Sequence, residues 1–391
     1  VQLIGNAVTS VTIYALAPVP LFLIMGEVLF HSGMAIRVFD ALDKLMGRLP
    51  GRLCYLTIGG GTIFAALSGS SMANTAMLGS LMVPEMVRRG YHPSMAMGPI
   101  MGTGALAMII PPSGLAVLLG SLARIDIGAL LIAGIIPGLI LACMYVAIVA
   151  FRVKLDPSCA PNYDVAPSSG REKLRSLAVD VSPMGLIVFC VVGLMILGWA
   201  TPTGSAAFGA LSVIALAAIY RSLKWETIVK SLRGTISVTG MLLLIIFASS
   251  TFSQLLAFSG ASSGLIGWAT GFHLPPLVML MVMFAIMLAL GCFMDQVSMM
   301  MLTLPIFMPI AAQYGFDPIW FGVILLLSLE IGLLTPPFGL VLFVMLGVAP
   351  QGTTIQQVVN AALPFIACPI LLVLLIVLLP DIATLLPSMM K

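Results

Sequence analysis

The sequence predicts an all-α polytopic membrane protein, built as an inverted-topology repeat with two re-entrant hairpins and two discontinuous helices. Three observations support this fold class. The 391 residues are 60% hydrophobic and only 8% charged, with a mean hydropathy of +1.17, well above what a soluble core needs. Uncharged runs such as 235–258 are long enough to cross a bilayer as helices. One stretch of the chain also occurs twice, at an offset of 225 residues.

Proline and glycine define the repeated stretch. These residues fix the shape of the backbone and are poor choices inside plain spanning helices, so the repeat predicts two copies of a broken-helix geometry. The corresponding pairs are Pro84 and Pro309, Gly90 and Gly315, Pro93 and Pro318, Pro111 and Pro336, Pro112 and Pro337, Gly114 and Gly339, and Leu115 and Leu340.

Two helices are expected before the first copy. Residues 8–30 form a spanning candidate that is interrupted by Pro18 and Pro20. Residues 33–52 combine cations with hydrophobic residues at helical spacing, which is typical of an amphipathic helix in the membrane interface. Their positive charge favours the cytoplasmic side.

The first copy begins with two apolar segments, 53–67 and 72–87, and each falls short of a comfortable span. We interpret them as a re-entrant hairpin whose tip, Ser68 to Ser71, stops inside the membrane. The alternative is a pair of tilted helices joined by a surface turn. The hairpin is favoured because irregular backbone at membrane depth is tolerated where it lines a cavity. Residues 94–110 then end at Pro111-Pro112, which leaves helix carbonyls available to a cation.

The rest of the chain is interpreted in the same way, with apolar runs as helices and charged stretches as connectors. The second copy has its hairpin tip at 293–296 and its break at Pro336-Pro337. The other predicted segments are the spans 128–151, 184–200, 206–220 and 235–258, the polar connector 152–180, the interfacial segment 221–233, the second-copy arms 277–292 and 297–312, the broken helix 319–335 with 338–348, and a last span with its core at 366–379.

The loops that close the two hairpins differ in charge. The first contains Arg88 and Arg89, while its counterpart at 311–318 carries one Asp and no cation. Short basic loops favour the cytoplasm, so the two copies are predicted to enter the membrane from opposite faces. This is the plan of many secondary transporters, whose substrate and ion sites lie at mid-depth between broken helices. The expected domains are a scaffold helix and interfacial arm at 1–52, transport-domain repeats at 53–127 and 276–350, scaffold helices at 128–275 with a connector at 153–183 and an arm at 221–233, and a C-terminal spanning helix at 351–391.

Oxygen atoms of the repeated stretch are candidates for ion binding. At the first tip, the serines offer hydroxyls, Asn74 offers an amide, and Gly69 lets the backbone pass closely. Such hard donors suit Na⁺ rather than a soft metal, and set against the Pro-Pro break they would make one cation site. In the second copy, Asp295 corresponds to Ser70, and a carboxylate at membrane depth is costly and usually functional. The alternative for the serines is close helix packing with hydroxyls bonded to preceding carbonyls. Glu27 and Glu330 are either interhelical hydrogen-bond partners or neighbours of a water-filled face.

Other classes of protein fit less well. The net charge of +3 gives no indication of nucleic-acid binding, and the six Cys have no paired spacing. An intramembrane metalloprotease is disfavoured because the three His stand alone. ATP hydrolysis is disfavoured because the sequence has no Gly-rich phosphate loop. A channel remains an alternative, although broken helices in an inverted repeat favour alternating access.

Five runs of the chain occur in a characteristic order between Pro18 and Pro380: PLFLIMGEVLFHSGMAIRVFD, ALSGSSMANTAMLGSLMVPEMVRRGY, IIPPSG, MDQVSMMMLTLPIFMPIAAQYGFDPIWFGVI and LLTPPFGLVLFV. Together they resemble the large membrane subunit of tripartite ATP-independent periplasmic (TRAP) transporters. The resemblance implies an elevator-type carrier in a bacterial or archaeal cytoplasmic (inner) membrane, driven by a Na⁺ gradient. Its cargo would be an organic acid such as a C4-dicarboxylate or a sugar acid.

The resemblance also implies two protein partners, namely a small four-helix membrane subunit, separate or fused upstream, and a periplasmic substrate-binding protein. Membrane lipid is the remaining partner, and no enzymatic activity is expected. The alternative is a stand-alone or H⁺-coupled elevator carrier of anions, in which Asp295 would carry the proton. The opening helix of relatives has no counterpart after Val1, so the numbering is expected to begin inside a longer chain.

Carried over by motif, the resemblance implies at least two Na⁺ sites and a substrate site where tips and breaks meet. Ala107 stands where relatives often place Gly. The residues expected to hold Na⁺, by side chain or carbonyl, are Ser68, Gly69, Ser70, Ala107, Ile110, Pro112, Asp295, Gly332, Thr335 and Pro337. The residues expected to face the substrate are Ser71, Asn74, Ser113, Met294 and Gln296.

Overall fold

The structure is a computed structural model that describes residues 12, 16–46, 49–161 and 169–389. These residues form helices and no strand, so the predicted all-α class is confirmed. Within this part of the chain, 6 helices are long and apolar enough to cross a membrane, or 8 if each of two bent helix pairs counts as one span. The chain is therefore a multi-pass membrane protein. Parts of three predicted segments lie outside the described residues, namely 8–11 with 13–15, 47–48, and 162–168.

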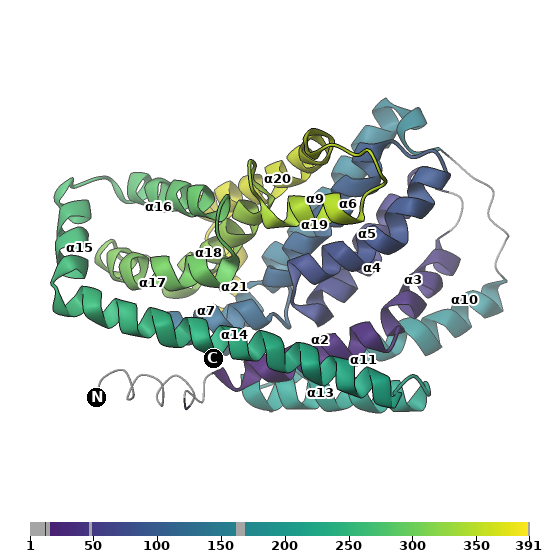
Figure 1. Ribbon diagram of the computed structural model, residues 1–391, viewed down its shortest axis with the longest axis horizontal. Helices are drawn as coiled ribbons and strands as arrows, with labels where there is room; N and C mark the ends of the chain where they lie inside the picture. Colours follow the sequence, from purple (N-terminus) through teal and green to yellow (C-terminus); the bar gives the residue numbers. More distant parts are fainter. Residues whose placement is uncertain (1–11, 13–15, 47–48, 162–168, 390–391) are drawn as a thin grey trace.

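Three helices pack side by side along one flank of the molecule (Figure 1). α2 (Pro18–His31) contacts both α13 (Pro202–Ile219) and α14 (Trp225–Phe258). α2 and α13 each begin at a proline, which suits a first helical turn because the missing N–H is not needed there. In Figure 1, α14 runs lengthwise from the end that carries α13 to the end that carries α15 (Ala261–Gly271).

The first copy of the repeat consists of four helices. α4 (Arg52–Ser68) and α5 (Ser71–Arg88) form the predicted hairpin, separated only by Gly69 and Ser70. α6 (Pro93–Ile109) packs against both of them and is buried along its length after the first two residues. α7 (Gly114–Ala123) follows the Pro-Pro break.

The second copy repeats this arrangement. α16 (Pro276–Gly291) and α17 (Gln296–Gln313) form the second hairpin, and α18 (Pro318–Leu334) is followed by the break and by α19 (Leu340–Val348). The bounds of α5 and α6 recur in α17 and α18 at the offset of 225 residues, and both Pro-Pro bonds are cis. The predicted recurrence of broken helices is thus confirmed.

The remaining described elements connect these groups or cover them. They are α3 (Met34–Leu45), α8 (Ile127–Ala133), α9 (Ile135–Leu155), η2 (Pro157–Cys159), α10 (Gly170–Ser176), η3 (Leu177–Val181), α11 (Ser182–Val188), η4 (Phe189–Gly193), α12 (Leu194–Ile196), α20 (Ile355–Leu378) and α21 (Asp381–Ser388).

The structure differs from the sequence prediction on both sides of α13. The charged stretch 221–233 is not a separate segment, because α14 includes most of it and continues past Gly234 to Phe258. Gly234 does not end a segment. It allows α14 to pack closely against Glu27, since a Cβ there would lie 2.5 Å from the Glu27 carboxylate. The end of the predicted connector is helical from Gly170 onward, where a capping box between Ser169 and Glu172 starts α10.

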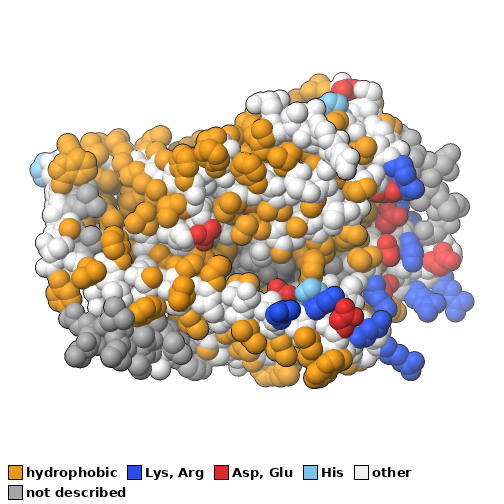
Figure 2. Space-filling view, in the orientation of Figure 1, with side chains coloured by type: hydrophobic (Ala, Val, Ile, Leu, Met, Phe, Trp, Pro, Cys, Tyr) orange, Lys and Arg blue, Asp and Glu red, His pale blue; other side chains and the backbone are white. Residues whose placement is uncertain are grey.

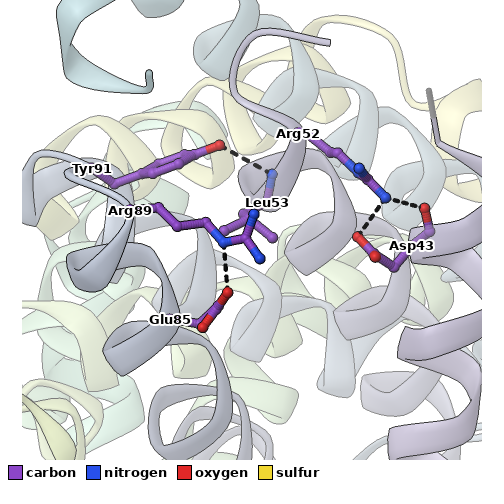
Figure 3. A network of polar contacts seen from close by, with 6 residues as sticks. All are labelled: Asp43, Arg52, Leu53, Glu85, Arg89 and Tyr91. Atoms are coloured by element: carbon purple, nitrogen blue, oxygen red, sulfur yellow. Dashed lines mark hydrogen bonds and ion pairs between the residues drawn. The ribbon is translucent and has the colours of Figure 1, made fainter. Parts of the chain in front are cut away.

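Charged side chains gather at one end of the molecule, while hydrophobic side chains cover most of the rest of the face in Figure 2. At the charged end, polar contacts connect α3 to the first hairpin (Figure 3). The buried guanidinium of Arg52 lies 2.8 Å from the Asp43 carboxylate on α3. The Tyr91 hydroxyl accepts the Leu53 N–H, and Arg89 pairs with Glu85 at 2.5 Å. The base of the first hairpin is therefore fixed, and its tip lies at the opposite end of α4 and α5.

Candidate functional site

The first hairpin tip lies on the first helix break. Gly69 ends α4 with φ +60°, and its N–H donates to the Ala65 carbonyl at 2.9 Å. A Cβ built on Gly69 would lie 3.4 Å from the Gly114 nitrogen and 3.9 Å from the Pro112 carbonyl oxygen. The positive φ favours glycine, and the two distances show that the tip lies in contact with the backbone of the break. The structure therefore brings together the tip and the break that the sequence predicted to meet.

Ser70 is the N-cap residue of α5, directly before its first residue. Its hydroxyl accepts the Ala73 N–H at 3.3 Å, which is an N-cap contact that satisfies one free amide of the first turn. Ser70 also lines a cavity that is described below. The side chain of Ser68, the other serine expected at this ion site, lies outside the described part of the structure.

The second tip lies on the second break in the same way. The Cys292 thiol lies 3.2 Å from the Pro336 carbonyl oxygen, and the rings of Phe293 and Phe338 are 5.6 Å apart. Asp295 starts α17, as Ser70 starts α5. One of its carboxylate oxygens accepts the N–H groups of residues 297 and 298, at 3.0 and 3.3 Å, and the other accepts the hydroxyl of residue 298.

The two copies meet at a buried carboxylate. Glu330, on α18, is 1% exposed. Its Oε2 accepts the Ser71 hydroxyl at 2.7 Å and the Gln296 side-chain amide at 2.8 Å. The same amide nitrogen lies 2.9 Å from the Met108 sulfur. The structure thus assigns Glu330 to the first of its two predicted alternatives, an interhelical hydrogen-bond partner.

A cavity of about 760 Å³ separates α2 and α14 from both tips. Its polar side chains are Glu27 and His31 on α2, and Ser70, Asp295 and Gln296 at the tips. The Oε2 of Glu27 and the Nε2 of His31 lie 3.2 Å apart, which is an ion-pair distance when the imidazole is protonated. The other described lining residues are apolar or glycine. An apolar cavity with a few converging polar groups is typical of a small-molecule site.

Four of the remaining residues expected at the ion sites lie near the breaks. The Thr335 hydroxyl donates to the Ile331 carbonyl at 2.6 Å, which leaves its lone pairs free to accept a cation. The Gly332 carbonyl accepts the Thr335 N–H at 3.0 Å, and a Cβ at Gly332 would lie 2.8 Å from the Gly291 Cα. In the first copy, Ala107 is fully buried and Ile110 caps the end of α6.

These donors are chemically suited to an alkali cation. They are hydroxyls, carbonyls and one carboxylate, which is the donor set that a hard cation prefers. No group of three or more His, Cys, Asp or Glu that could hold a metal ion occurs among the described residues. Donors of these types suit Na⁺ better than a transition metal.

The residues expected to face the substrate divide into two groups. Gln296 lines the cavity. Ser71, Asn74 and Ser113 are buried and do not line it in the described structure, and neither does Met294. The Ser113 hydroxyl instead caps α7 by accepting the Ala116 N–H at 3.2 Å.

Glu27 and His31 were not predicted as cavity residues. The signal available in the sequence was a charged residue inside an otherwise apolar span, and it left two interpretations open for Glu27. The structure resolves this because Glu27 faces the cavity opposite both tips.

Comparison with known proteins gives one consistent family. The chain matches the family described as "Tripartite ATP-independent periplasmic transporter, DctM component" over residues 2–382. It is 33% identical to the C4-dicarboxylate TRAP transporter large permease protein DctM of Pseudomonas aeruginosa, covering 96% of this chain and 86% of that protein. It is 29% identical to the sialic acid TRAP transporter permease protein SiaT of Haemophilus influenzae, covering 98% of this chain and 62% of that protein.

Two solved structures share the fold. The YdaH transporter of Alcanivorax borkumensis aligns with a TM-score of 0.70 at 12% identity, over 99% of this chain and 87% of that one. The antimetabolite efflux pump MtrF of Neisseria gonorrhoeae aligns with a TM-score of 0.63 at 13% identity, over 99% and 82% of the two chains. At such identities the likeness concerns the fold alone.

Proposed function

Because this chain belongs to the DctM component family of TRAP transporters, we propose that it forms the membrane pathway for Na⁺-coupled import of an organic acid. The observation that carries the proposal is the cavity between α2 and the two hairpin tips, where Ser70 and Asp295 face the same space. Among the cargoes that relatives are named for, C4-dicarboxylates and sialic acid are carboxylates and isethionate is a sulfonate, so carboxylates are the commoner class. We therefore propose a carboxylate as the substrate class.

The proposed partners follow from the family and its relatives. TRAP transporters are tripartite, so we propose a small membrane subunit and a periplasmic binding protein that delivers the substrate. A relative from Oleidesulfovibrio alaskensis is named DctMQ, and this chain covers 58% of its length. The remaining length of that relative has room for a fused second component. Since the proposed binding protein is periplasmic, we also propose that the chain lies in the cytoplasmic membrane.

We propose an elevator mechanism, in which the two copies of the repeat move together against α2 and α14. The cavity supports this division because its walls come from two groups of helices. One wall is formed by α2 and α14, and the other by both tips and the start of α7. Motion between these groups would open the cavity to one side of the membrane and then to the other.

Na⁺ would act as the co-transported ion. The Asp295 carboxylate supplies negative charge at the second tip, and the Thr335 hydroxyl and the carbonyls at the breaks supply neutral oxygens. The alternative is a carrier that works alone or with protons. It is favoured by one observation, namely that the carboxylates of Glu27 and Asp295 line the same cavity.

Transport in liposomes tests the proposal. Liposomes are prepared that contain the chain, either with its small subunit or alone. They are incubated with a panel of radiolabelled organic acids and candidate binding proteins in the outer solution, with and without an inward Na⁺ gradient. Saturable uptake that requires both the binding protein and Na⁺ is expected. Uptake by the chain alone, insensitive to Na⁺ and driven by a pH gradient, would establish the alternative instead.

A further inference from the structure

The first residues of α5 and α17, the second arms of the two hairpins, both donate a hydrogen bond to the same oxygen atom. Ser71 is the first residue of α5 and Gln296 is the first residue of α17. Their side chains donate to the same Oε2 of Glu330, at 2.7 and 2.8 Å. All three side chains are buried, with exposed fractions of 2%, 6% and 1% in that order. The contact joins residues that are 259 positions apart in the sequence.

The two donors are equivalent in the repeat, but the acceptor is not. Ser71 and Gln296 differ by the repeat offset of 225 positions, while the position equivalent to Glu330 is Ala105. At this position, therefore, only the second copy has a carboxylate. Close packing of two similar copies would not by itself require this asymmetry, because hydrophobic residues of similar volume pack at least as stably as buried ionic groups.

The contact lies directly behind the cavity. Ser71 follows Ser70, and Gln296 follows Asp295, and both of these N-cap residues line the cavity. Gln296 itself lines the cavity while its amide nitrogen donates to Glu330. A shift of either tip by a bound ion or substrate must therefore lengthen or reorient a hydrogen bond to the shared oxygen. In a buried site such a bond is strong, because no water competes for it.

We propose that Glu330 is a positioning residue that couples the two hairpin tips, so that the position of one tip depends on the position of the other. The transport consequence, cooperative binding of ion and substrate at the two tips, rests on the proposed function. The mechanical coupling of the tips does not depend on that function. It can therefore be measured without transport.

A carboxylate can also carry a proton, so this second role has to be separated from positioning. Among the described residues, the other oxygen, Oε1, has no hydrogen-bond partner. The Glu330→Gln variant separates the two roles. A glutamine carbonyl oxygen can accept from both Ser71 and Gln296, so it keeps the positioning contacts, but it cannot release a proton.

Hydrogen exchange of the purified, full chain in lipid nanodiscs tests the coupling. The readout is the exchange rate in two segments, 72–78 after the first tip and 297–303 after the second. In Glu330→Met, which keeps a side chain of similar length without an acceptor, exchange should rise about tenfold or more in both segments. In Glu330→Gln, both segments should stay within about threefold of wild type.

The Ser71→Ala variant gives the sharper outcome, because it removes one small donor and leaves the charge in place. Exchange should rise in 72–78 and, to a smaller extent, in 297–303. In the Glu330→Met background the same substitution should add nothing at 297–303. If Ser71→Ala leaves 297–303 unchanged, the tips are independent and the proposal is overturned, even if Glu330→Met does not fold.

The Glu330→Gln result decides the remaining point. If its exchange matches wild type while Na⁺-driven uptake is retained, positioning is the role of Glu330. If both tips loosen in Glu330→Gln as they do in Glu330→Met, the charge and not the shared acceptor is required, which contradicts the proposal. Loss of uptake with wild-type exchange would leave the coupling intact and show that transport also needs the ionisable carboxylate, which counts against the proposed Na⁺ coupling alone.

Discussion

Asp295 offers the most direct test of the proposed ion site, because its carboxylate has two separable roles. As the N-cap of α17 it accepts two backbone N–H groups. As a cavity residue it supplies negative charge at the second tip. Asparagine caps a helix about as well as aspartate, so Asp295→Asn removes the charge and keeps the cap. Asp295→Ala removes both.

The two roles differ in their expected size. Loss of the cap should cost about 1 kcal/mol of folding stability in Asp295→Ala and almost none in Asp295→Asn. Loss of a charged ligand oxygen should weaken Na⁺ binding by roughly 1.5–3 kcal/mol in both variants, which is about a tenfold to hundredfold loss of affinity. The Na⁺ concentration for half-maximal uptake should therefore rise about tenfold to hundredfold in both variants, and uptake at a Na⁺ concentration that just saturates wild type should fall several-fold or more.

Asp317 provides the matched control. It caps α18 with the same geometry, accepting the N–H groups of Ile319 and Trp320 at 2.9 and 2.8 Å, but it is exposed and lies outside the cavity. Asp317→Ala should lose a similar amount of stability and keep Na⁺-driven uptake. The measurements are thermal unfolding of the purified chain and initial uptake rate against Na⁺ concentration. Wild-type Na⁺ activation in Asp295→Asn would refute the assignment of Asp295 to the ion site.

Two further predictions concern the cavity walls. Ser70→Leu should abolish uptake while the chain still folds, because the larger side chain occupies the cavity at the first tip; unchanged uptake kinetics would support a packing role for this serine. Gly234→Ala should alter the KM for substrate by several-fold, because the added Cβ would lie 2.5 Å from the Glu27 carboxylate and must displace it. Gly240→Ala, on the same helix with nothing within 4 Å, is the control and should transport like wild type.

The hairpins and breaks were predictable because their signals are local. Gly69 ends a helix with a positive φ, and the prolines at 111–112 and 336–337 end α6 and α18 where the sequence placed them. The recurrence of these residues at one offset also identified the two copies. Each of these features depends on backbone conformation within a few residues, which amino-acid type strongly constrains.

The contact of Glu330 with both tips was not predictable in the same way. Its two donors lie on two other helices, and one is 259 residues away in the sequence. A single sequence carries no signal for such a pairing beyond the presence of a buried carboxylate. Gly234 shows the opposite case. Glycine was interpreted as the boundary between two segments, but the helix continues through it, and the missing side chain instead allows α14 to pack closely against Glu27. Long-range packing decided both cases.

The charges of the cavity predict the order in which ion and substrate bind. Its described lining contains two carboxylates, Glu27 and Asp295, and no Lys or Arg, while His31 is paired with Glu27. An organic anion about 6 Å from an unneutralised Asp295 would be repelled by about 3 kcal/mol at an effective dielectric constant of 20. That repulsion corresponds to more than a hundredfold loss of affinity.

A cation bound beside Asp295 would remove this repulsion, so Na⁺ should bind first. The apparent KM for the substrate should then fall steeply as Na⁺ rises, with a smaller change in the maximal rate. In Asp295→Asn, where the repulsion is absent, substrate binding measured by calorimetry should become nearly independent of Na⁺ even though uptake is impaired. Substrate binding to wild type that is equally tight with and without Na⁺ would contradict this order, and it would mean that the substrate carboxylate lies away from the second tip.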